Sequence, residues 1–156
     1  MHKSDVKICL VSSSGGHFEQ LLRLLPLLDK YSGYVVTEDT GYELDLPNRL
    51  VYRVPSMDRT DKGIIRELVA SLRAAWKILR AEKPDVIIST GALPALPTLM
   101  LGKILGSKVV YLESFAKVNT PNKAGRLVYH FADRFYVQWK PMLKFYPKAI
   151  YKGGIY

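Results

Sequence analysis

The stretch Ser12-Ser13-Ser14-Gly15-Gly16-His17 separates an apolar segment from a leucine-rich one. Residues 7–11 (KICLV) form the continuous apolar run expected of a strand buried on both faces, as in a parallel sheet. Residues 17–28 then follow a helical pattern. A serine- and glycine-rich turn between a strand and a helix directs backbone N–H groups into the turn, where the helix N-terminus adds partial positive charge. The stretch therefore predicts a turn that binds phosphate or diphosphate.

The sequence leaves other interpretations of this turn open. The dinucleotide fingerprint G-x-G-x-x-G and the pattern G-x-x-x-x-G-K-[ST] do not fit, because Gly15 and Gly16 are adjacent and His17 follows them. The simpler alternative is a tight turn at the two glycines, with Ser14 as the helix cap. A histidine at a helix start is more often a local hydrogen-bonding residue than a catalyst. His17, however, follows a strand at the predicted carboxyl edge of the sheet, where ligands of open α/β folds bind.

Composition indicates one globular domain with an anionic partner. The chain has 156 residues, of which 48% are hydrophobic, which is enough for one core and too little for two α/β domains. Its 23 Lys and Arg outnumber 14 Asp and Glu, for a net charge of +9. Most of this excess lies in residues 117–156, where Asp133 is the single acid. Nucleic acid, an anionic membrane and phosphorylated substrates all fit this charge, as does a solvated face.

The cysteine content and the apolar runs favour a cytoplasmic location. Cys9, the single cysteine, lies in the first apolar run, so we expect a buried side chain in a reducing compartment. The first residues lack the apolar region of a signal peptide, and no apolar run reaches the roughly 18 residues of a membrane-spanning helix. No His and Asp cluster has metal-ligand spacing, so we expect neither a metal nor another cofactor. Any membrane contact is expected to be peripheral.

Apolar runs and helical patterns alternate along the chain. Pro26 is expected to kink or end the first helix early. The alternation predicts one Rossmann-like α/β domain over residues 1–156, with a mostly parallel sheet and helices on both faces. We expect strands at residues 7–11, 34–37, 50–54, 85–89, 108–112, 135–137 and 149–151, and helices at 18–29, 64–82, from the turn at 90–94 up to 105, 124–132 and 141–146.

Two further groups of residues follow strands at the same predicted edge. Thr90-Gly91-Ala92-Leu93-Pro94 is a second strand-to-helix turn, so two turns can hold one ligand from two sides. Glu113 comes directly after the strand at 108–112. Its carboxylate can bind sugar hydroxyls, act as a base or cap a neighbouring turn, and the sequence leaves these roles open.

Two surfaces are candidates for contact with a membrane. Residues 18–29 are apolar on nearly all sides, which is typical of a helix enclosed in protein or pressed against lipid. Residues 64–82 form an amphipathic pattern with a separate basic stripe, which can meet anionic headgroups or simply face solvent. The residues concerned are Leu21, Leu24, Leu25 and Leu28 in the first segment, and Arg66, Arg73, Lys77 and Arg80 in the second.

Four segments in this order resemble a known family: KICLVSSSGGHFEQLLRL, KPDVIISTGALPALPTLM, KVVYLESFAKV and ADRFYVQW. They resemble bacterial capsular and exopolysaccharide proteins that act as enhancer subunits of a glycosyltransferase. They are also similar to the membrane-recruiting subunit of the eukaryotic two-part N-acetylglucosaminyltransferase that builds dolichol-linked oligosaccharide. The resemblance implies the N-terminal, acceptor-binding half of a GT-B fold, as in the enzyme that glycosylates undecaprenyl-diphosphate sugar in peptidoglycan synthesis.

The resemblance also implies roles for individual residues. The acceptor, a polyprenyl-diphosphate-linked sugar, would face the first loop, and His17 would be the base that deprotonates the acceptor hydroxyl or a donor to phosphate. The reaction would invert the anomeric carbon without a metal, with His17 and Glu113 as the catalytic residues. Substrate-binding residues carried over from the family are Ser14, Gly15, Gly16 and His17, then Gly91, Ala92 and Pro94, and finally Glu113 with Ser114 beside it.

In such a family the nucleotide-sugar domain is a separate polypeptide. We therefore expect a heterodimer, little or no activity of this chain alone, and a peripheral position on the inner face of the plasma membrane. The eukaryotic relatives begin with a transmembrane anchor, which this sequence lacks, so attachment is expected through an exposed apolar and basic surface. The expected dock for the catalytic partner follows the last strand, at Lys152, Gly153, Gly154, Ile155 and Tyr156.

Two other functions are weighed against this one. A stand-alone transferase for a phosphorylated or nucleotide-sugar substrate would use His17 and Glu113 as an acid/base pair. Nucleic-acid binding through the basic last quarter would use aromatic side chains for stacking, but their strand and helix patterns favour a place in the core, so we expect no nucleic-acid partner. The aromatic residues are Tyr129, Phe131, Phe135, Tyr136 and Trp139.

Overall fold

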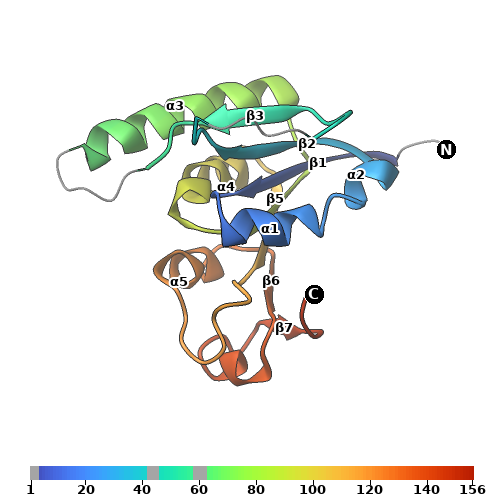
Figure 1. Cartoon of the computed structure of the whole chain (residues 1–156), viewed down its shortest axis with the longest axis vertical. Coiled ribbons are helices and arrows are strands. Elements are labelled where there is room, and N and C mark those ends of the chain that lie inside the picture. The colour runs from blue at the N-terminus through green and yellow to red at the C-terminus, as the bar shows by residue number, and fades with distance from the viewer. Residues whose placement is uncertain (1–3, 42–45, 58–62) are drawn as a thin grey trace.

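Seven parallel strands form one sheet in the part of the chain that the computed structural model describes, namely residues 4–41, 46–57 and 63–156 (Figure 1). Every neighbouring pair is parallel. The predicted fold class is therefore confirmed. In spatial order the strands are β3 (Val51–Val54), β2 (Tyr31–Glu38), β1 (Ser4–Ser12), β4 (Val86–Gly91), β5 (Lys108–Leu112), β6 (Arg134–Val137) and β7 (Ile150–Tyr151).

Helices cover both faces of the sheet. The short helices α1 (Gly16–Leu22) and α2 (Leu27–Lys30) pack on one face, over β1 and β2. The other face carries α3 (Ile64–Glu82), α4 (Leu96–Ile104) and α5 (Lys123–Tyr129). Two short 3-10 helices, η1 (Leu93–Ala95) and η2 (Lys140–Lys144), complete the described elements.

The position of β1 between two cores explains why its residues 7–11 are apolar without alternation. Ile8 and Leu10 enter the smaller core with α1 and α2, whereas Cys9 and Val11 enter the larger core on the opposite face. Both faces of β1 are therefore buried, as its apolar run predicts.

Element boundaries follow the sequence signals closely. The helix 64–82 and the strand 108–112 begin and end where predicted. Pro26 interrupts the first leucine-rich segment, because α1 ends at Leu22 and α2 begins only at Leu27. Gly106, with a φ of 97°, follows the end of α4, which is the usual place for a glycine after a helix.

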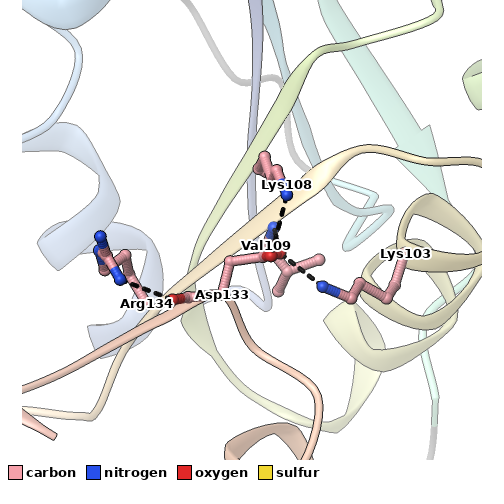
Figure 2. Close-up of polar contacts among 5 residues, drawn as sticks. All are labelled: Lys103, Lys108, Val109, Asp133 and Arg134. Atoms are coloured by element: carbon pink, nitrogen blue, oxygen red, sulfur yellow. Dashed lines mark hydrogen bonds and ion pairs between the residues drawn. The ribbon is translucent and has the colours of Figure 1, made fainter.

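Asp133 joins three elements at the amino edge of the sheet, opposite the predicted site (Figure 2). Its carboxylate accepts hydrogen bonds from Lys103 Nζ at 2.7 Å, from the Val109 N–H at 2.8 Å and from Lys108 Nζ at 3.4 Å. Partial burial acts to raise the pKa of Asp133, but these donors outweigh it and lower the pKa to about 2. The ionised carboxylate thus stabilises the contacts between α4, β5 and β6.

The substitution Asp133→Asn tests this contribution to stability. Because the pKa of Asp133 is lower in the folded chain than in the unfolded one, its stabilisation is present above about pH 4 and is lost as the pH falls toward 2. We expect the variant to lose about 1–2 kcal/mol at pH 7, and less at low pH. Urea unfolding at pH 7 and pH 3 measures both values. Asp39→Asn, which breaks an exposed ion pair with Arg53, is the control and should change little. An unaltered pH dependence in Asp133→Asn would contradict this assignment.

The five aromatic residues weighed for base stacking lie in the core, against it or half-buried on a strand. Phe135 is buried and stacks on Tyr111, with ring centroids 5.1 Å apart. Tyr129, Phe131 and Trp139 are partly buried against the same core. The expectation that these aromatic residues belong to the core is confirmed for Phe135. Tyr129, Phe131 and Trp139 pack against the core, and Tyr136 is half-buried on β6.

Candidate functional site

Five neighbouring strands bring the predicted site residues to one edge of the sheet. Because β2, β1, β4, β5 and β6 are parallel, their carboxyl ends lie together. The first glycine loop follows β1, the second loop follows β4, and Glu113 follows β5. The expectation that two strand-to-helix turns share one edge is therefore confirmed.

The first loop is exposed, and some of its backbone N–H groups are already hydrogen-bonded within the protein. Ser14, Gly15 and Gly16 are exposed, and Gly15 has a φ of 69°, which favours glycine. The Ser13 N–H donates to the Gly91 carbonyl at 2.8 Å. Within the described ranges, no group accepts from the N–H of Gly15 or Gly16. These two amides are thus the ones that a ligand can reach.

The Ser14 N–H, which was predicted to bind an anionic ligand, instead donates a hydrogen bond to Glu38. The carboxylate at the end of β2 accepts from Ser14 N–H at 2.9 Å and from the Ser14 hydroxyl at 3.3 Å. Its second oxygen accepts from the Ser56 hydroxyl at 2.9 Å. Ser14 therefore supports the loop rather than offering its amide to a phosphate. Nor does Ser14 cap α1. The N-cap is Gly15, which has no side chain that could make a capping hydrogen bond.

Sequence reasoning missed Glu38, although a signal for it was present. The segment YVVTE ends its apolar run with a carboxylate, just as KVVYLE does at Glu113. In a parallel sheet both positions fall at the carboxyl edge. An acid directly after a buried strand is thus a recurrent feature of this edge.

His17 is held by the second loop in one orientation. Its Nδ1 lies 2.7 Å from the Thr90 carbonyl oxygen, and the Thr90 hydroxyl donates to the His17 carbonyl at 2.7 Å. A carbonyl oxygen only accepts, so this geometry assigns the proton of the neutral ring to Nδ1. Nε2 then carries the lone pair, and the half-buried ring can accept a proton there.

The second loop supports the first rather than presenting free amides. Gly91 N–H donates to the Ser89 hydroxyl at 3.0 Å, and Ala92 N–H donates to the Ser13 hydroxyl at 3.3 Å. Gly91 has a φ of 100°, and a Cβ there would lie 3.0 Å from the His17 ring. Pro94 lies within η1, the single turn that precedes α4. Gly91 thus lies against the His17 ring and Ala92 bonds the first loop through Ser13, and the contact of both residues with substrate stays a prediction.

Glu113 is fully buried and caps the turn that follows it. Its carboxylate accepts from the Ser114 N–H and from the Tyr146 hydroxyl, each at 2.9 Å, and from the Asn122 side-chain amide. Burial raises the pKa of Glu113, and these hydrogen bonds only partly oppose the effect. The capping interpretation accounts for all these contacts. A role for Glu113 in acid/base chemistry, or for the buried Ser114 in binding, stays a prediction.

Half of the leucine surface predicted to meet a membrane lies inside the protein. Leu21 and Leu28 are 0% and 1% exposed, since α1 and α2 pack these side chains against β1 and β2. That part of the prediction is wrong, because the parallel sheet needs them as its cover. Leu24 and Leu25 are partly buried against the same core.

The basic stripe of α3 borders an apolar surface. Arg66, Arg73, Lys77 and Arg80 are all exposed, as predicted. Only part of α3 packs into the core, through Ala75, Ile78 and Leu79 among others. Apolar side chains on α3 and on the adjacent α4 are also exposed, and an apolar cavity of about 420 Å³ lies between the two helices. The exposed apolar residues are Ile65, Leu68, Val69 and Trp76 on α3, and Met100, Ile104 and Leu105 at α4; with the four basic residues, we call them the α3–α4 surface.

The segment 152–156 lies beside α1. The Ile155 N–H donates to Gln138 Oε1 at 2.9 Å, and the Tyr156 ring meets Phe115 edge-on, with centroids 4.9 Å apart. The Arg23 guanidinium lies 5.3 Å from the centre of the Tyr156 ring. Lys152, Gly154 and Tyr156 are exposed, while Gly153 and Ile155 are half-buried. Their proposed contact with a partner stays a prediction.

Neither a metal centre nor a membrane span was found in the described part of the chain. No three His, Cys, Asp or Glu side chains gather there as a metal site requires. No helix among the described residues combines the length and the hydropathy needed to cross a bilayer.

Comparison with known proteins gives a consistent family. Residues 57–155 match the family model described as "Oligosaccharide biosynthesis protein Alg14 like". The human protein named "UDP-N-acetylglucosamine transferase subunit ALG14" is 30% identical, over 98% of this chain and 84% of its own length. The Schizosaccharomyces pombe protein of the same name is 32% identical, over 90% and 79%.

Solved structures share the fold at low sequence identity. MurG from Acinetobacter baumannii superposes with a TM-score of 0.70 at 15% identity, over 85% of this chain and 41% of its own. UDP-N-acetylglucosamine 2-epimerase from Rickettsia bellii gives a TM-score of 0.74 at 12% identity, over 96% and 45%. The chain thus spans less than half of these GT-B-like proteins, and at this identity the likeness concerns the fold alone.

Proposed function

Because this chain belongs to the Alg14-like family of oligosaccharide biosynthesis proteins, we propose that it is the acceptor-binding accessory subunit of a two-component glycosyltransferase. It would hold a polyprenyl-diphosphate-linked sugar and recruit a catalytic subunit that binds the nucleotide sugar. The pair would then transfer the sugar to the acceptor. The relatives named above are transferase subunits by name, which supports the division of labour.

The observation that carries this proposal is the orientation of His17 beside the exposed glycine loop. The Thr90 carbonyl fixes the Nδ1 proton, so Nε2 is available to take a proton at the edge where ligands of such sheets bind. The free N–H groups of Gly15 and Gly16 adjoin it. A base next to two free amides fits an acceptor that carries both a hydroxyl and a diphosphate.

The proposed reaction is a direct displacement at the anomeric carbon of the nucleotide sugar. His17 Nε2 takes the proton of the acceptor hydroxyl while the oxygen forms a bond to the anomeric carbon of the nucleotide sugar. The bond from that carbon to the nucleotide breaks on the opposite face, so the configuration inverts. The nucleotide, which is bound to the partner subunit, keeps the electron pair of the broken bond as it leaves. This chain supplies the base and the acceptor site.

The α3–α4 surface is the proposed contact with an anionic membrane. Its exposed apolar side chains can enter the headgroup region while the four basic residues meet lipid phosphates. We place the protein in the cytoplasm, peripheral on the inner face of the plasma membrane. Assignment to capsule or exopolysaccharide synthesis rests on the sequence resemblance alone, since the relatives named above are eukaryotic.

Charge introduced into the α3–α4 surface should release the protein from vesicles. We expect Val69→Glu combined with Trp76→Glu to weaken binding to vesicles containing anionic phospholipid at least about tenfold. The two substitutions replace apolar contacts with the lipid by negative charges that repel it. Flotation of protein with vesicles measures the effect. The control is Tyr151→Glu, an equally exposed position on β7 at the far end of the sheet from α3 (Figure 1). Equal release by both variants would contradict the assignment.

Reconstitution tests the proposed function as a whole. The chain is co-expressed with a candidate catalytic glycosyltransferase subunit, and transfer to a polyprenyl-diphosphate sugar is measured with both chains and with each alone. We expect co-purification and activity only from the pair. Turnover by this chain alone would favour the alternative, a stand-alone transferase. A pair that never forms, or a partner fully active by itself, would refute the subunit proposal.

A further inference from the structure

Two buried glutamines lie between the first glycine loop and the segment 152–156. Gln20 comes from α1 and Gln138 follows β6, so the two are far apart in sequence. Their side chains are 4% and 3% exposed. A buried side-chain amide is costly unless its donors and acceptor are bonded, so the partners of both glutamines matter.

The two side chains form one continuous set of hydrogen bonds. Gln138 Nε2 donates to Gln20 Oε1 at 2.7 Å and to the Glu113 carbonyl at 3.0 Å. Gln20 Oε1 also accepts from the Phe115 N–H at 2.9 Å, and Gln20 Nε2 donates to the Gly16 carbonyl at 3.2 Å. Gln138 Oε1 accepts from the Ile155 N–H at 2.9 Å. A path of hydrogen bonds therefore joins Gly16 to Ile155.

These contacts fix the orientation of both amides. Gln138 faces a backbone N–H with its oxygen and a backbone carbonyl with its nitrogen, so a rotated amide would lose both bonds. Phe115 is held twice, through its N–H on Gln20 and through its carbonyl, which accepts from Trp139 Nε1 at 2.6 Å. Hydrogen bonds therefore join the glycine loop, the turn after β5 and the segment 152–156 to one another.

We propose that Gln20 and Gln138 are positioning residues that set the glycine loop in register with the docking site of the catalytic subunit. The inference rests on the proposed function, in which segment 152–156 meets the partner and the loop holds the acceptor. The partner carries the donor sugar, so its placement on segment 152–156 determines where the anomeric carbon lies relative to His17. The glutamine pair is a direct hydrogen-bonded connection between those two places.

The relative position of the glycine loop and the docking site has a measurable consequence for the reaction rate. The acceptor oxygen must approach the anomeric carbon within about 3–3.5 Å in line with the departing bond, and a misplacement of about 1 Å can reduce the rate about 100-fold. Acceptor binding needs only the loop itself. Loss of the glutamine pair should therefore lower kcat while leaving the KM for the acceptor nearly unchanged.

The test uses Gln138→Met and Gln20→Met in the reconstituted pair, since methionine keeps the length of the side chain and removes its hydrogen bonds. We expect kcat to fall about 10- to 100-fold and the acceptor KM to stay within about threefold. The double variant should be no worse than the more affected single variant, because both break the same connection. The matched control is Ser107→Ala, which removes another buried hydrogen bond, to the Pro84 carbonyl at 2.6 Å, at the amino edge of the sheet. It should leave kcat unchanged.

A purely structural role would give a different result. Equal loss of kcat in Ser107→Ala, a rise in KM without a change in kcat, or full additivity of the two glutamine substitutions would each overturn the proposal. If a methionine variant does not fold, Ile155→Pro removes the N–H that bonds Gln138 and leaves both glutamines in place; unchanged kcat in that variant would overturn the proposal too. Failure of the proposed function is distinct, since the wild-type pair itself would then show no joint activity.

Discussion

Replacement of His17 by alanine should lower turnover of the assembled pair about 10²- to 10⁴-fold while the affinity for the acceptor stays nearly unchanged. The physical reason is the orientation of the ring: Nδ1 is bonded to the Thr90 carbonyl, so Nε2 can accept the proton of the acceptor hydroxyl. Alanine removes the base and leaves the amides of Gly15 and Gly16 in place. Steady-state kinetics with saturating donor, together with equilibrium binding of the acceptor, measures both quantities.

The two proposed roles of His17 predict opposite results. A donor to phosphate would show its loss mainly in acceptor affinity, with turnover at saturation little affected. His130→Ala is the control, because this exposed histidine at the end of α5 is outside the site and should be neutral in both assays. Unchanged turnover and unchanged affinity in His17→Ala would leave the residue without either role and would contradict the proposed site.

Substitution of Gly91 by alanine should impair the site from the side of the second loop. A Cβ at this position would lie 3.0 Å from both Cε1 and Nδ1 of His17 and 3.1 Å from the Tyr111 hydroxyl. The ring must therefore shift by a few tenths of an ångström, which disturbs its hydrogen bond to the Thr90 carbonyl. We expect turnover to fall about 10- to 100-fold, because the base is displaced from its position. We also expect a loss of about 1–2 kcal/mol in stability, because an L-residue is disfavoured at a φ of 100°.

Gly106 provides a matched control for Gly91→Ala. Its φ of 97° imposes the same backbone cost on alanine, but beyond its own residue and chain neighbours no atom of the described residues lies within 4 Å of the added Cβ. Gly106→Ala should therefore lose similar stability in urea unfolding and keep full turnover. If both alanine variants lose turnover equally, the effect comes from general destabilisation, and the contact between Gly91 and His17 is not what matters.

The fold could be predicted from local sequence because each signal has one physical cause. The run KICLV lacks alternation, as expected of a strand buried on both faces, and β1 lies between the two cores on opposite faces of the sheet. In KVVYL, Val109 and Tyr111 are buried, whereas Val110 and Leu112 are half-buried. Pro26 and Gly106 mark helix boundaries through their own backbone constraints. Such features depend on a few neighbouring residues, so they can be predicted from the local sequence.

The candidate site was less predictable because its contacts are long-range. The pairing of Glu38 with Ser14, and of His17 with Thr90, depends on which strands are neighbours, which no local pattern states. The leucines of residues 18–29 look alike in sequence, but only the packing decides that Leu21 and Leu28 are internal. Conversely, the apolar pattern of α3 resembles an ordinary core face, and only the structure leaves Ile65 and Trp76 exposed.

The place of β1 inside the sheet has a consequence for how the chain acquires its shape during synthesis. β1 is translated before its neighbour β4, which lies about 80 residues later in the chain. Until β4 is available, one side of β1 lacks its partner, and a pairing over such a separation forms slowly. The nascent chain therefore passes through a stage in which His17 exists without Thr90. The reactive ring acquires its orientation only after Thr90, at the end of β4, has been translated.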